Sequence, residues 1–149
     1  MENMDKKYTC YCGLYCENCA VKKKIGPASE VLYNEMKKAG FEDIIKFIPD
    51  SGGFWPFLKN MAENGICISC REGGGNPACA VRICASGRSG AKEENAGMCA
   101  FCEDYPCEKF KPFFEGYPVL KNDNDVLRNE GWDAWSKMQN ERMAKGFTY

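Results

Sequence analysis

Eleven cysteines and no histidine define the chemistry open to this chain of 149 residues. In chain order they fall as Cys10-x-Cys12-x3-Cys16-x2-Cys19, Cys67-x2-Cys70, Cys79-x4-Cys84 and Cys99-x2-Cys102-x4-Cys107. A Cys-x2-Cys pair suits a tetrahedral ion, because a tight turn brings both sulfurs to ~2.3 Å from one metal. We therefore interpret the two cysteine-rich stretches, 10–19 and 67–107, as one metal–thiolate core.

The lack of histidine removes several kinds of site at once. Mixed Cys/His zinc sites, Ser-His or Cys-His nucleophile pairs and imidazole general bases are all excluded. Any metal must be held by thiolate, with carboxylate or water as the remaining donor. No residue is assigned a catalytic role, and the pattern favours a protein that is not an enzyme.

Disulfides are the first alternative to metal. The start of the chain, MENMDKKYTCYC, has no apolar segment typical of a secretory signal, and no run of ~18 apolar residues predicts a membrane span. We therefore expect a cytoplasmic protein without a membrane partner. Cysteines in that compartment are kept reduced, and closely spaced ones bind metal more often than they pair. The odd number of cysteines also excludes complete pairing within one chain.

The predicted metal ligands are ten cysteines: Cys12, Cys16, Cys19, Cys67, Cys70, Cys79, Cys84, Cys99, Cys102 and Cys107. The working partition joins the Cys-x2-Cys pairs of 67–70 and 99–102 in one site. The other three cysteines of the second stretch then share a second set of ligands with cysteines of the first stretch. Other groupings of the ten cysteines stay open. Cys10 is expected to remain uncoordinated and inert.

Zinc is the expected metal, with two ions per chain and a structural role, while the finished surface contacts another molecule. A zinc ion with four thiolates carries −2, so two such sites would take the formal charge from −1 to about −5. Arg82, between Cys79 and Cys84, is expected to neutralise or hydrogen-bond a metal–thiolate group.

An iron–sulfur cluster, in an electron carrier or redox sensor, is the alternative cofactor. Cys12-x3-Cys16-x2-Cys19 has the spacing of radical enzymes that use S-adenosylmethionine, but the chain shows neither the length nor the βαβ pattern of their barrel. The run from Cys99 to Cys107 departs from the ferredoxin pattern. A nucleic-acid-binding zinc module is the second alternative, and the formal charge of −1 without a basic stripe argues against it. A protein is the partner class left open.

The elements that position these cysteines are predicted to be helical. The composition, 44% hydrophobic and 13% aromatic, is that of a globular protein. Apolar spacing predicts helices over 28–39, capped by Ser29, over 41–48 and over 54–64, which together form an insert at about 28–65. A C-terminal helical segment at about 110–149 is interrupted at Gly131. Glycines and prolines make 66–107 loop-rich. We expect one domain over 1–149, mainly α, with irregular metal-stapled loops around a zinc-knuckle-like core and at most a short β-hairpin.

The cysteine motifs also resemble those of a known family. Cys12-Gly13-Leu14-Tyr15-Cys16-x2-Cys19, then Cys67-x2-Cys70, then Cys79-x2-Arg82-x-Cys84-Ala85, then Cys99-x2-Cys102-x3-Pro106-Cys107-Glu108-Lys109 are similar to the DUF3795 family of small cysteine-rich bacterial and archaeal proteins. The resemblance runs from about Tyr11 to Lys109, and Cys10 is additional to its motif. It implies metal binding, with zinc as the expected ion, and no established activity.

Overall fold

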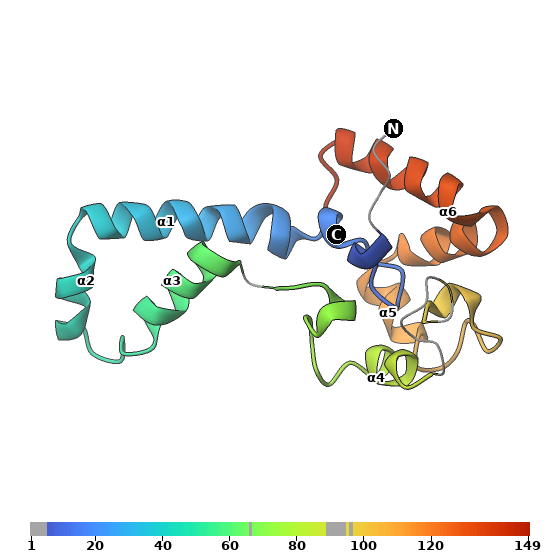
Figure 1. Cartoon of the computed structure of the whole chain (residues 1–149), viewed down its shortest axis with the longest axis horizontal. Helices are drawn as coiled ribbons and strands as arrows, with labels where there is room; N and C mark the ends of the chain where they lie inside the picture. The colour runs from blue at the N-terminus through green and yellow to red at the C-terminus, as the bar shows by residue number, and fades with distance from the viewer. Residues whose placement is uncertain (1–5, 66, 89–94, 96) are drawn as a thin grey trace. The chain divides into compact units, whose positions relative to one another are not determined.

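The computed structural model describes residues 6–65, 67–88, 95 and 97–149. The chain divides into two compact units. The first unit comprises residues 1–19 and 68–149, and the second comprises 20–67. The single domain expected from the sequence stays a prediction. Figure 1 shows the α-helices of both units.

The second unit is a helical hairpin. Its helices are α1 (Gly26–Lys38), α2 (Phe41–Ile44) and α3 (Phe54–Asn64), and α1 packs along α3 (Figure 1). Pro56 lies in the first turn of α3, and Gly65 ends it with a φ of 72°. Proline is tolerated in a first turn and glycine readily adopts positive φ after a last one, so both ends follow from local sequence.

Two details of this unit differ from the sequence-based predictions. Ser29 does not cap α1, because the helix already begins at Gly26, and its hydroxyl instead donates to the carbonyl oxygen of Ile25 at 2.7 Å. The core face of α1 also differs, because Tyr33 of this helix packs against Trp55 and Leu58 of α3. The apolar residues whose spacing predicted these helices but which are exposed are Ala28, Val31, Leu32, Ala39, Ile44, Ile48, Phe54 and Phe57.

The first unit holds the remaining helices, α4 (Ala80–Ser86), α5 (Lys111–Gly116) and α6 (Leu120–Ala144). The predicted interruption at Gly131 is confirmed, since α6 bends there at φ 84° and ψ −174°. Short 3-10 turns occur at Cys16–Asn18, Cys70–Glu72 and Cys99–Phe101. The described residues contain no strand, in agreement with the prediction of at most a short hairpin, and an isolated antiparallel bridge joins Thr9 and Tyr15.

Two apolar clusters hold the first unit together. One contains Cys12, Val81, Cys99, Phe110 and Leu120, and so places thiols inside the core. The other is built on Trp135 of α6 and packs it edge-on against Tyr15, with ring centroids 5.6 Å apart. The core of this unit is therefore assembled around the cysteine loops. Of the helices in the described ranges, none has the length and apolar character needed to span a membrane.

Candidate functional site

The first cysteines lie in a tight loop. The bridge between Thr9 and Tyr15 closes its base, the amide of Cys10 donates to the carbonyl oxygen of Leu14 at 2.7 Å, and the amide of Gly13 donates to that of Cys10 at 2.9 Å. Gly13 has a φ of 94°, which side chains rarely tolerate. The chain therefore turns back on itself within a few residues.

This turn brings several thiols together. The sulfur atoms of Cys10 and Cys16 lie 3.7 Å apart, and the Cys10 thiol also interacts with the side chains of Cys12 and Cys70. We name these four residues the Cys10 thiol group. Hydrogen bonds to Cys12, Cys16 and Cys70, in that order of importance, raise the pKa of Cys10 well above its usual range. These hydrogen bonds and burial favour the protonated form of Cys10.

Cys70 joins this group from a distant part of the chain. The Nε of Arg71 donates to the carbonyl oxygen of Thr9 at 2.8 Å, and its guanidinium lies 5.2 Å from the ring centroid of Tyr11. The hydrogen bond from Cys10 lowers the pKa of Cys70 to about 6, against an opposing effect of burial and with help from the backbone amide of Tyr11. These contacts therefore favour the thiolate form of Cys70 beside the first loop.

A second feature shapes the turn after Cys70. Arg82 of α4 donates to the carbonyl oxygens of Gly74 and Gly73, at 2.9 and 3.0 Å. A Cβ on Gly74 would stand 1.7 Å from the carbonyl oxygen of Ile68, so only glycine fits there. The glycine run is a compact turn, and the charge of Arg82 also lowers the pKa of Cys70. Arg82 therefore acts on the Cys70 thiol through its charge, whereas the hydrogen bonds of its guanidinium go to backbone carbonyl oxygens.

Three further thiols interact with Arg88, and a fourth interacts with one of these three. The Nη2 of Arg88 donates to the sulfur of Cys84 at 3.6 Å, and the charge of Arg88 interacts with Cys102 and Cys99. Cys99 interacts in turn with Cys102 and Cys107. We name Cys84, Cys99, Cys102 and Cys107 the Arg88 thiol group. It joins α4 to the turn at Cys99–Phe101 and to the segment that follows.

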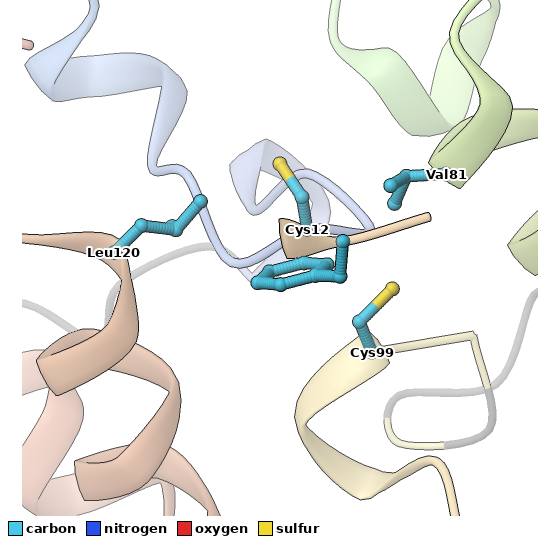
Figure 2. Close-up of a cluster of buried hydrophobic side chains, with 5 residues drawn as sticks. Cys12, Val81, Cys99 and Leu120 are labelled. Carbon is cyan, nitrogen blue, oxygen red and sulfur yellow. The ribbon is translucent and has the colours of Figure 1, made fainter. Parts of the chain in front are cut away.

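The two thiol groups adjoin each other. Figure 2 shows Cys12 and Cys99 in the same buried cluster, coming from different segments of the chain. The amide of Cys99 donates to the carbonyl oxygen of Tyr11 at 2.8 Å, which fixes this approach. Burial, followed by the charge of Cys12, raises the pKa of Cys99 to about 12, while the charge of Arg88 opposes the rise. Cys99 is therefore a thiol unless a cation replaces its proton.

Three predicted ligands lie outside both groups as defined. Cys79 is half-buried against the cluster that contains Cys12 and Cys99, Cys19 is half-buried after the turn at Cys16–Asn18, and Cys67 is exposed and belongs to the second unit. All eleven cysteines are described, and none is in a disulfide. The structure thus brings Cys70 to Cys10, and leaves the grouping of 67–70 with 99–102 a prediction.

The thiols of both groups have the donor chemistry of a metal site, although the site is not fully assembled. Over the described ranges, no three Cys, Asp or Glu side chains already converge on one point suitable for an ion. The donors nevertheless fit zinc or an iron–sulfur cluster, since both take thiolates. The 3.7 Å between the sulfurs of Cys10 and Cys16 is also close to the ~3.8 Å that separates two sulfurs bound at ~2.3 Å to a tetrahedral ion.

Sequence spacing sets Cys10 apart, whereas the structure places it at the centre of a thiol group. The sequence Cys10-x-Cys12-Gly13 does contain a signal for this arrangement. Glycine after the second cysteine permits a positive-φ turn that brings the chain back toward Cys10. Spacing alone does not reveal such a turn. The Cys-x2-Cys rule finds only pairs whose sulfurs meet through one regular turn.

Comparison with known proteins gives one match. The family described as "Protein of unknown function (DUF3795)" matches residues 8–112, which include every cysteine. No curated protein and no solved structure matches the chain.

Proposed function

This chain belongs to the DUF3795 family, whose function is unknown, and from that premise we propose that it is a zinc-binding protein in which thiolate-bound metal stabilises the first unit. In this proposal the metal is structural, and the folded surface is what a partner contacts. When bound, zinc supplies cross-links between loops that have little regular structure of their own.

The Arg88 thiol group is the observation that carries the proposal. Its members come from α4 and from the segment between 99 and 107, and three of them interact with the guanidinium of Arg88. Four thiolates around zinc carry a net charge of −2, and a neighbouring arginine offsets part of it. Thiols next to a cation combine the donors and the neighbouring positive charge that such a site requires.

The raised pKa of Cys99 is consistent with this role. Burial makes the bare thiolate of Cys99 costly, so the protein alone holds it protonated. A divalent cation removes that cost, because the metal takes the place of the proton. Metal binding is then coupled to proton release and to the stability of the unit.

Metal analysis of protein purified without oxygen tests the proposal directly. We expect about two zinc ions per chain and a colourless protein. Iron with acid-labile sulfide, in a brown protein that absorbs near ~400 nm, would instead identify an iron–sulfur protein. The absence of any bound metal would contradict both.

A chelator then tests whether the metal is structural. Removal of zinc should abolish hydrogen-exchange protection in peptides from 97–107, since structural zinc contributes on the order of 10 kcal/mol of apparent binding energy. Peptides from α3 are the internal control, because its Leu58 packs in a separate core with Tyr33 and Trp55. Unchanged protection in 97–107 after complete metal loss would contradict a structural role.

A further inference from the structure

We propose that Cys10, Cys12, Cys16 and Cys70 form one metal site, in which Cys10 is a ligand. This inference rests on the proposed zinc binding and deepens it, since it assigns four donors to a single ion. It gives Cys10 a role that neither the family motif nor the spacing of the cysteines indicates.

Distances within the group support a common ion. The sulfurs of Cys10 and Cys16 lie 3.7 Å apart, and the Cys10 side chain interacts with both of the other members. Tetrahedral coordination at ~2.3 Å places each pair of sulfurs ~3.8 Å apart. The sulfurs of Cys10 and Cys16 therefore already have the separation of two ligands of one ion.

The backbone around the four thiols is already fixed. The loop from Cys10 to Cys16 is closed by the bridge between Thr9 and Tyr15, and Arg71 ties Thr9 to the turn that carries Cys70. The backbone amide of Tyr11 also hydrogen-bonds Cys70. Hydrogen bonds from neighbouring groups orient the ligands of metal sites. The hydrogen bond from the Tyr11 amide to Cys70 is of this kind.

Positive charge is available beside the group. Arg71 and Arg82 both interact with the charge of Cys70. The Nη2 atom of Arg71 is buried and, among the residues that the structure describes, has no hydrogen-bond partner. A buried donor of this kind is costly unless an anionic group lies nearby. A four-thiolate site with its net charge of −2 would provide that group.

Thiol alkylation combined with metal counting tests the assignment. In zinc-loaded wild-type protein, mass spectrometry should find Cys10 protected from alkylation together with Cys12 and Cys16, and a chelator should expose all three. Cys70→Ser should lose about one zinc ion per chain and expose Cys10, while Cys102 stays protected. Cys84→Ser is the matched control: it removes a thiol from the Arg88 thiol group and should leave Cys10 protected.

Cys10→Ser gives the second readout and should also lose about one zinc ion. The assignment is overturned if wild-type Cys10 is alkylated while Cys12 and Cys16 are protected, or if Cys10→Ser retains all of its zinc. These outcomes differ from failure of the proposed function, in which the wild-type protein itself binds no metal. The alkylation of wild-type protein needs no variant, so it decides the question even where a substitution impairs folding.

Discussion

The side-chain amide of Asn124 donates to the carbonyl oxygen of Cys12 at 2.9 Å and so joins α6 to the first cysteine loop. This amide and the carbonyl oxygen of Cys12 are both buried, and the amide also donates to the carbonyl oxygen of Leu120 within α6. A side chain near the start of α6 therefore helps to set the position of a predicted metal ligand far away in sequence.

We expect Asn124→Ala to destabilise the first unit by about 2 kcal/mol, because it leaves a buried carbonyl oxygen without its donor. Urea denaturation of the zinc-loaded protein measures this change. Asn122→Ala is the control, since Asn122 is exposed on the same helix and should change stability by less than about 0.5 kcal/mol. Equal stability of the two variants would show that the bond to Cys12 is unimportant.

Gly13 makes a second testable contact with Asn124. A Cβ on Gly13 would stand 2.7 Å from the side-chain nitrogen of Asn124, and its φ of 94° adds backbone strain. Gly13→Ala should therefore cost about 3 kcal/mol or more. Gly146→Ala is the matched control in the same unit, with a φ of 72° and no atom within 4 Å of the added Cβ, and should cost only about 1 kcal/mol. Thermal unfolding of both variants should rank them in this order, and the reverse order would contradict the close approach.

Asp123 anchors a buried polar network in the first unit. Its Oδ2 accepts from Arg142 at 2.6 Å, from Gln139 at 3.0 Å and from the hydroxyl of Tyr149 at 3.3 Å. Gln139 in turn accepts from the side-chain amide of Asn18, in the turn that follows Cys16. The network thus connects the end of the chain to the first cysteines.

Asp123→Asn should destabilise the protein by about 2 kcal/mol or more, because Arg142 is left largely buried without its counter-charge. Denaturant midpoints measure the effect. The control is Asp125→Asn, which breaks an exposed pair with Lys121 and should change stability by about 0.5 kcal/mol or less. Finding no difference between these variants would mean that the network contributes little.

Tyr149 predicts a pH dependence. Burial, followed by the charge of Asp123, raises the pKa of its phenol above the ordinary 10.0. A raised pKa means that the folded state keeps the proton that the unfolded state loses. The resulting stability is therefore complete below pH ~10 and is lost as the pH rises above that value.

We expect Tyr149→Phe to be less stable than wild type by about 1 kcal/mol at neutral pH, since the hydroxyl bonds of Tyr149 are lost. Above pH ~10 its stability should fall less steeply than that of wild type. Urea titrations at several pH values measure both effects, and the other ionising groups cancel in the comparison. Tyr117→Phe, at an exposed tyrosine, is the control. Parallel curves for wild type and Tyr149→Phe would contradict the prediction.

Several elements could be predicted because their signals are local. Helix α3 follows from apolar spacing, from Pro56 in its first turn and from Gly65 after its last residue, and the bend of α6 follows from Gly131. The expected cap at Ser29 is wrong because Pro27, also a local signal, starts the helix earlier. The expected core face of α1 is wrong because Tyr33 meets Trp55 through a contact that periodicity along one helix does not specify.

The sequence by itself determined the helical class, the family and the exclusion of histidine as a ligand, since each depends on residue types and short spacings. Only the tertiary structure decided which thiols meet. Cys10 reaches Cys70 because Arg71 binds the backbone at Thr9, and Cys99 approaches Cys12 because its amide binds the carbonyl oxygen of Tyr11. Such contacts join segments dozens of residues apart, and their geometry depends on packing that the spacing of cysteines along the chain does not encode.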